Sequence, residues 1–211
     1  MNTQNPKSKK TLAIVVITFC VLVLFVAVNY WSSALAQNQY KTLEKGNDFN
    51  PPVEISQVKS KVGLIETDKK FSANADWFKG LDLEIKNKFD KPLTHISLSV
   101  RFPRTEQGKK DFVAPIYYGE SPISSQNGEF LTNTVKPIAP GESVNLKITD
   151  DYYEQIKTAL SESNYPSQIQ KIRVYVTVIG FEDNTIWMAG NMYQIDRDNP
   201  GKLIPLGKKK L

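Results

Sequence analysis

Residues 80–102, GLDLEIKNKFDKPLTHISLSVRF, contain two runs in which apolar and polar side chains alternate. An alternation with a period of two predicts strands that each bury one face. Between the runs, residues 87–92 hold the Asn, Asp and Pro that are typical of a turn. We therefore predict an antiparallel hairpin that ends at Pro103. Its apolar positions are Leu81, Leu83, Ile85, Ile96, Leu98, Val100 and Phe102.

The same alternation recurs toward the C-terminus, at residues 144–148 and 172–178. The second of these segments is the longest predicted strand. After a turn at residues 182–184, residues 185–195 are predicted to return as its partner strand. Gly190 would allow a bulge or a bend in that partner.

A helix is predicted between these strands, opening at Asp150 and Asp151 and ending within residues 161–166. Glu154 lies three residues after Asp151, as in a capping box. One stripe of the helix is apolar and is expected to face the core. The stripe consists of Tyr152 or Tyr153, Ile156 and Leu160.

The remaining segments after Pro52 are less regular. Residues 53–75 predict one or two edge strands, and residues 104–136 predict a long loop with one or two short strands. Loops of this length in a compact domain are often functional. Alternating strands, antiparallel turns and one helix together predict a single mainly β domain over residues 53–211, built as a β-sandwich with a crossing helix.

The order of strand, Asn-containing turn, strand, Pro-Gly-Glu turn and strand resembles small immunoglobulin-like modules exported by bacteria, such as FxLYD-type domains. The resemblance covers residues 80–148 and rests on KNKFDKPLTHISLSVRF and IAPGESVNL. Pro103 and Arg104 stand where the family has a Tyr-Asp signature. The resemblance implies an immunoglobulin-like antiparallel sandwich that serves in binding or assembly rather than in catalysis.

The N-terminal segment predicts the compartment. Residues 11–28, TLAIVVITFCVLVLFVAV, carry no charge, and three lysines precede them within residues 7–10. We predict a transmembrane signal anchor over residues 11–31, closed by Tyr30 and Trp31 at the headgroup layer. Residues 1–10 would then be a cytoplasmic basic segment, and the C-terminal domain would lie in the periplasm or on the cell surface.

A cleaved signal peptide is the alternative, because Ala34-Leu35-Ala36 has the small-x-small form that signal peptidase accepts. Cleavage after residue 36 would release a secreted protein. The apolar run exceeds the usual length of a cleaved segment, which favours the anchor. Residues 37–52 are polar, end in two prolines and are predicted to be a linker.

Charge excludes one class of function. The formal net charge is +5, but the surplus comes from lysines at the two ends, residues 7–10 and 208–210. The domain between them is close to neutral and shows no basic stripe interleaved with aromatic residues. Nucleic-acid binding is therefore rejected.

No residue set for catalysis is recognisable, so we expect no enzyme, no cofactor and no metal. The single cysteine, Cys20, lies within the apolar run, and the single histidine, His95, lies on the polar face of a predicted strand. We expect His95 to be an ordinary exposed or half-buried strand residue. Serine or cysteine nucleophiles need a histidine base, and zinc needs clustered Cys and His.

Two weaker chemical alternatives remain. Residues 196–201, DRDNPG, have the start of a calcium loop, although a solvated turn is the favoured interpretation. Asp82 with Glu84, or Asp150 with Asp151, could serve as paired carboxylates in an envelope hydrolase. We favour an outward polar face for the first pair and helix capping for the second.

The candidate binding residues are aromatic: Tyr117 and Tyr118 in the irregular segment, and Trp187, for which a place in the core is the competing interpretation. We expect a non-catalytic, membrane-anchored extracytoplasmic module that binds another envelope protein or serves as an accessory subunit. A carbohydrate-binding module and a hydrolase acting through carboxylates are the alternatives.

Overall fold

The computed structural model describes residues 39–46, 49–104, 110–122, 135–196, 198–199 and 202–206, together with Val23. A compact unit extends over Tyr40–Leu211. The predicted membrane segment, residues 11–31, lies outside the described residues except for Val23. Over the described ranges, no helix has the length and apolar character needed to cross a bilayer.

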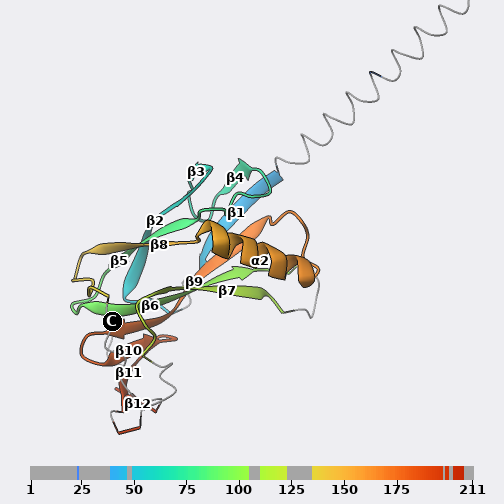
Figure 1. Ribbon diagram of the computed structural model, residues 1–211. Coiled ribbons are helices and arrows are strands. Elements are labelled where there is room, and N and C mark those ends of the chain that lie inside the picture. The colour runs from blue at the N-terminus through green and yellow to red at the C-terminus, as the bar shows by residue number, and fades with distance from the viewer. Residues whose placement is uncertain are drawn as a thin grey trace, which may run out of the picture. The chain divides into compact units, whose positions relative to one another are not determined.

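One of the two sheets has four strands that are all antiparallel to their neighbours (Figure 1). Its inner strands are paired over most of their lengths, with Val53 opposite Asn87 and Leu83 opposite Leu146. In spatial order the strands are β3 (Gly63–Leu64), β2 (Val53–Ser60), β5 (Asp82–Asn87) and β8 (Ser143–Lys147).

The second sheet has eight strands arranged around β9 (Lys171–Phe181). Along one edge β9 pairs with β6 (Leu93–Phe102), which in turn pairs with β7 (Phe112–Tyr118). Along the other edge, β1 (Gln39–Gly46) runs parallel to the start of β9, and β10 (Thr185–Met188) is antiparallel to its end. The outer strands are β4 (Lys70–Ala73) beside β1, then β11 (Asn191–Ile195) and β12 (Leu203–Pro205) beyond β10.

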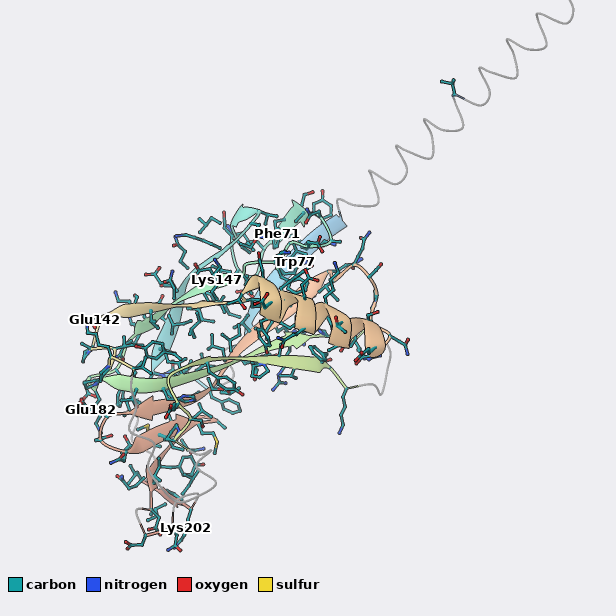
Figure 2. All side chains as sticks on the ribbon, viewed as in Figure 1. Phe71, Trp77, Glu142, Lys147, Glu182 and Lys202 are labelled. Carbon is teal, nitrogen blue, oxygen red and sulfur yellow. The ribbon has the colours of Figure 1, made fainter. Side chains whose placement is uncertain are left out.

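The two sheets bury their apolar faces in a common core, which confirms the predicted mainly β, two-layer architecture. Leu83 and Ile85 come from one sheet, and Leu98 and Val100 from the other. Trp77 is fully buried, and its Nε1 donates to the carbonyl of Ile169 at 2.7 Å. Phe71 and Trp77 pack together at the end of the unit that carries β3 and β4, and Lys202 lies at the other end (Figure 2).

The predicted hairpin over residues 80–102 is wrong, because β5 and β6 belong to different sheets. Each strand has its own neighbours, β2 and β8 for β5, and β7 and β9 for β6. The connection between them crosses the sandwich and is held by Asn87, whose side chain is buried. Its Nδ2 donates to the carbonyls of Lys91 and Ile138, and its Oδ1 accepts from the amide of Phe89.

The predicted linker is wrong for Gln39–Gly46, which form strand β1. Thr42 to Gly46 pair in register with Lys171 to Tyr175 of β9. The inward positions are Lys41 and Leu43, and both are fully buried. A lysine at an inward position conceals the alternation of apolar and polar residues, so the sequence shows no strand here.

The predicted single partner strand at residues 185–195 is two strands. Ala189 and Gly190 both have positive φ, 48° and 83°, and form a two-residue turn between β10 and β11. Turns of this kind require left-handed conformations at both central positions and favour glycine. The bend expected at Gly190 is therefore a complete reversal, and β10 pairs with β9 only over Val178 to Gly180.

Helix α2 (Asp150–Glu162) connects β8 to β9, as predicted. Tyr153, Ile156 and Leu160 are its buried residues, which confirms the apolar stripe. The predicted capping box is wrong, because the N-cap is Thr149, whose hydroxyl accepts from the amide of Tyr152 at 3.2 Å. The hydroxyl of Tyr152 donates to the carbonyl of Pro115 at 2.7 Å, so α2 lies against the outer strand β7.

Candidate functional site

Trp187 is not available to a ligand. Its side chain is 1% exposed and belongs to the core cluster, so the competing core interpretation is confirmed. A side chain enclosed between strands cannot stack on a sugar or a peptide at the surface. Trp187 is therefore removed from the candidate binding residues.

Tyr117 and Tyr118 lie in strand β7, not in a loop, and they point to opposite faces of the sheet. Tyr117 is 57% exposed, and its ring centroid lies 6.1 Å from that of His95. Tyr118 is half-buried against the core, and its hydroxyl donates to the carbonyl of Lys136. The two rings therefore do not form a joint binding platform.

His95 is buried, which corrects the expectation of an exposed or half-buried strand residue. A register shift between Leu93 and His95 places the imidazole opposite Gly180, which has no side chain to displace it. Its Nδ1 lies 3.2 Å from the carbonyl oxygen of Gly119. Burial lowers the pKa of His95, so the ring is neutral at physiological pH.

The candidate carboxylates do not converge. Asp82 and Glu84 are half-buried on one side of β5. One carboxylate oxygen of Asp82 lies 3.5 Å from the side-chain Nδ2 of Asn145. Asp150 and Asp151 lie in the first turn of α2. Among the described residues, no group of three or more His, Cys, Asp or Glu side chains could hold a metal ion.

Part of the calcium candidate, residues 196–201, is described. The carboxylate of Asp196 accepts from the amide of Asp198 at 3.0 Å and pairs with Lys202 at 3.3 Å. The hydrogen bonds and the ion pair lower the pKa of Asp196. These contacts are typical of a carboxylate that stabilises a turn, and the other acidic residue described here, Asp198, is exposed.

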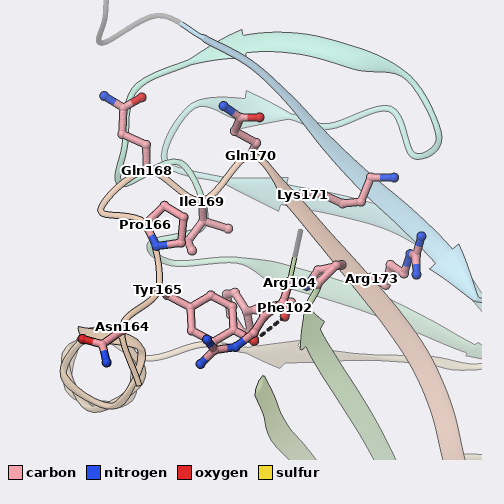
Figure 3. Close-up of a pocket in the computed structure, with 11 residues that line it drawn as sticks. Phe102, Arg104, Asn164, Tyr165, Pro166, Gln168, Ile169, Gln170, Lys171 and Arg173 are labelled. Atoms are coloured by element: carbon pink, nitrogen blue, oxygen red, sulfur yellow. Dashed lines mark hydrogen bonds between the residues drawn. The ribbon is translucent and has the colours of Figure 1, made fainter. Parts of the chain in front are cut away.

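A cavity with a volume of about 760 Å³ lies among the described residues. It lies where the end of β6, the segment after α2 and the start of β9 meet (Figure 3). Its described lining combines apolar, amide and cationic side chains and includes no carboxylate. The lining residues are Phe102, Pro103, Arg104, Asn164, Tyr165, Pro166, Gln168, Ile169, Gln170, Lys171 and Arg173.

Arg104 is held in this pocket by contacts that leave part of its guanidinium unused. The guanidinium carbon lies 4.2 Å from the centroid of the Tyr165 ring, and one terminal nitrogen donates to the carbonyl of Ser163. The Nε atom is buried and has no hydrogen-bond partner in the described part of the chain. Because Nε is enclosed by protein, an anion that enters the pocket can reach only the terminal nitrogens of this guanidinium.

Tyr165 is itself fixed by two hydrogen bonds. Its hydroxyl donates to the carbonyl of Phe102 at 2.8 Å, drawn in Figure 3, and accepts from the amide of Phe112 at 2.5 Å. The tyrosine thereby joins the end of β6 to the start of β7. The ring that supports Arg104 is therefore part of the rigid framework and not of a loose loop.

Lys171 and Arg173 occupy alternate positions at the start of β9 and share one carboxylate, that of Glu44 on β1. The two nitrogen–oxygen distances are 2.6 Å and 2.7 Å. Hydrogen bonds from Lys171 and Arg173 lower the pKa of Glu44, and the bond to Glu44 raises the pKa of Arg173. Asp111 is a second carboxylate near this wall, because its charge also raises the pKa of Arg173 and its Oδ1 accepts from the backbone amide of Arg104 at 3.2 Å. The cations at the pocket therefore lie near two carboxylates, those of Glu44 and Asp111.

A further arginine lies beside the pocket. Arg101 is directly opposite Arg173 in the pairing of β6 with β9, and its guanidinium lies over the ring of Tyr175 at 4.5 Å. Three of the four arginines of the chain, Arg101, Arg104 and Arg173, therefore gather at this end of the large sheet. The sequence separates Arg101 from Arg173 by a long interval, and only the pairing of β6 with β9 brings them together.

No known protein family, curated protein or solved structure matches this chain. The resemblance to FxLYD-type modules stays a prediction.

Proposed function

We propose that this chain is a non-catalytic, membrane-anchored extracytoplasmic binding module, acting as an accessory subunit or a partner-binding protein of the cell envelope. In this proposal the cationic pocket holds an acidic segment of the partner. The observation that carries the proposal is the arrangement of Arg104, Lys171 and Arg173 around one cavity whose described lining has no carboxylate.

The chemistry of the lining favours a carboxylate attached to an apolar segment. Arg104 is pre-oriented on Tyr165, and charge-assisted hydrogen bonds from its terminal nitrogens to a carboxylate would be among the stronger polar contacts in proteins. Phe102, Ile169 and Pro166 supply apolar surface next to the cations. A cavity of about 760 Å³ is large enough for a few side chains of a peptide.

The same lining supports binding rather than catalysis. A hydrolase acting through carboxylates needs two acids that converge on the substrate, and the described lining offers none. The one histidine, His95, is buried against Gly119 and is not among the lining residues. Arginine and amide side chains position an anion but do not supply a nucleophile or a general base at neutral pH.

An immunoglobulin-like topology is part of the proposal. The neighbours β2, β5 and β8 correspond to strands A, B and E of that fold, and β7, β6, β9 and β10 correspond to C′, C, F and G. The crossing from β5 to β6 and the helix between β8 and β9 fall where the immunoglobulin chain changes sheets. This order supports the expectation drawn from the FxLYD-type resemblance.

The membrane anchor is also proposed, on the uncharged run at residues 11–28 and the lysines before it. A tethered module would present its pocket to partners in the same envelope. Cleavage after residue 36 would instead release the module as a secreted protein. The mass of the mature protein distinguishes the two, because a chain that begins at Gln37 has lost the anchor.

Crosslinking of the full chain in native membranes tests the proposed function. We expect one stable partner to be recovered with the wild type, and about tenfold less of it with Arg104→Ala. Arg104→Lys keeps the charge but not the fork of donors and should be intermediate. Lys91→Ala is the matched control, since Lys91 pairs with Asp183 away from the pocket.

Glu44→Gln tests the same proposal with a variant that is expected to strengthen binding. It releases Lys171 and Arg173 from their shared carboxylate and should increase recovery of an acidic partner. Equal recovery with all four variants, or no recovered protein, would contradict the proposal. Recovery of anionic lipid alone would show that the pocket binds a headgroup and not a protein segment.

A further inference from the structure

The turn between β2 and β3 exposes apolar side chains at one tip of the sandwich. Val62 is 44% exposed and Leu64 is 64% exposed, and Gly63 between them has a φ of 106° with open space where a Cβ would lie. Tyr40, near the start of β1, is 71% exposed. These side chains are not covered by any described part of the unit.

Exposed lysines lie on the same strands and turns as these apolar side chains. Lys59, Lys61, Lys69 and Lys70 are all exposed and lie in or beside β2, β3 and β4. Lys61 pairs with Asp150, and Lys69 pairs with Glu66. Lys59 and Lys70 have no ion pair within the described part of the chain. Exposed apolar side chains with an aromatic ring and a rim of lysines are typical of surfaces that enter the headgroup layer of a bilayer.

The tip lies at the end of the unit where β1 begins. β3, β4 and the start of β1 lie together at this end (Figure 1), which also carries the start of β9. Only residues 32–38 separate Trp31, where the predicted anchor ends, from Gln39, where β1 begins. Seven residues reach about 25 Å at full extension, so the tip would stay close to the membrane surface.

We infer that the tip formed by Tyr40, Val62 and Leu64 docks onto the anionic bilayer in which the chain is anchored. The apolar side chains enter the headgroup layer, and Lys59 and Lys70 contact lipid phosphates. Docking would hold the sandwich in one orientation on the membrane. The inference rests on the anchor in the proposed function but does not depend on what the cationic pocket binds.

Fluorescence of the full chain in vesicles tests the inference. Cys20→Ala removes the only native thiol, and Leu64→Cys then accepts an environment-sensitive fluorophore at the tip. Leu206→Cys is the matched control, because Leu206 is 46% exposed and follows β12 at the other end of the unit. The vesicles contain phosphatidylcholine with or without phosphatidylglycerol, and a spin-labelled lipid serves as quencher.

We expect the spin-labelled lipid to quench the label at residue 64 at least about twofold more than the label at residue 206, and only in vesicles with phosphatidylglycerol. Val62→Glu and high salt should each reduce that difference. Equal quenching at the two positions, in a chain that floats with the vesicles, would overturn docking and leave the anchor in place. A chain that does not float with the vesicles would overturn both.

Discussion

The guanidinium of Arg104 lies over the ring of Tyr165, and the hydroxyl of the same tyrosine joins the end of β6 to the start of β7. One side chain therefore supports the cationic pocket and closes the framework around it. Tyr165, which lines the pocket, also forms hydrogen bonds with backbone groups of both strands. The geometry of the pocket and the stability of the domain are consequently linked.

Tyr165→Phe should destabilise the domain by about 2 kcal/mol, because the carbonyl of Phe102 and the amide of Phe112 both lose their hydroxyl partner. The aromatic ring remains and still supports Arg104. Chemical denaturation gives the free energy of unfolding. Tyr193→Phe is the control, since the Tyr193 hydroxyl has no hydrogen bond within the described residues, and it should change stability by less than about 0.5 kcal/mol.

Asn87→Asp should destabilise the domain by about 3 kcal/mol at neutral pH. The buried Asn87 amide donates to the carbonyls of Lys91 and Ile138 at 2.9 Å and 3.0 Å, and a carboxylate would face both oxygens without a proton to donate. The midpoint of urea unfolding measures the loss. Asn50→Asp, at an exposed position between β1 and β2, should have little effect. An equal loss of stability in both variants would show that the hydrogen bonds of Asn87 do not stabilise the connection between β5 and β6.

Lys41→Met should stabilise the domain by roughly 1 kcal/mol or more. Lys41 is fully buried, and its Nζ has no hydrogen-bond partner among the described residues. Lys45→Met is the control in the same strand and should not stabilise, because the Nζ of Lys45 donates to the carbonyl of Ile55 at 2.7 Å.

Lys41→Met should also change how the stability of the domain depends on pH. Burial lowers the pKa of Lys41, so above the lowered value the unfolded chain binds more protons than the folded chain. Wild-type stability should therefore rise with pH between the lowered pKa and the ordinary value of 10.5. Thermal melts across this range should show that rise in the wild type and lose the Lys41 contribution in Lys41→Met.

The wild type should lose stability on mild acidification, and His95→Gln should lose less. Burial lowers the pKa of His95 below its ordinary value of 6.5, so the unfolded chain takes up a proton first as the pH falls. Wild-type stability should fall from about pH 6.5 downward by at most about 1.4 kcal/mol per pH unit, until the lowered pKa is reached. Melting temperatures of the two proteins across this range measure the effect. His95 is the only histidine, so parallel curves would contradict its burial.

Alternation of apolar residues was sufficient to predict the mainly β class and the inward faces of β5, β6, β8 and the first half of β9. The prediction fails at Val178, because a register shift against β6 reverses the alternation and buries Ile179 and Phe181 instead. It indicates which face of a strand is buried but carries no information about the neighbouring strand. β5 and β6 follow one another closely in sequence and were therefore predicted to pair, although each is an inner strand of a different sheet. The helix was predicted correctly because Tyr153, Ile156 and Leu160 repeat with the helical period.

The candidate site could not be predicted from the sequence, because the sequence does not show which strands are neighbours. Arg101 and Arg104 lie at the end of one strand, Lys171 and Arg173 lie at the start of another, and nothing local in the sequence relates the two groups. Their common location depends on the antiparallel register of β6 with β9, in which Arg101 meets Arg173. Tyr117 and Tyr118 were selected as aromatic residues of a predicted loop, and Trp187 for its residue type, whereas pleat direction and burial decide what each can touch.

The parallel pairing of β1 with β9 also has a mechanical consequence. Thr42 to Gly46 lie along Lys171 to Tyr175, so tension applied at the N-terminus acts along the ladder and loads its hydrogen bonds together in shear. A strand pulled from its end at right angles would instead release its bonds one after another. If the chain is tethered as proposed, the first strand after the tether is thus arranged to bear force while the rest of the sandwich stays folded.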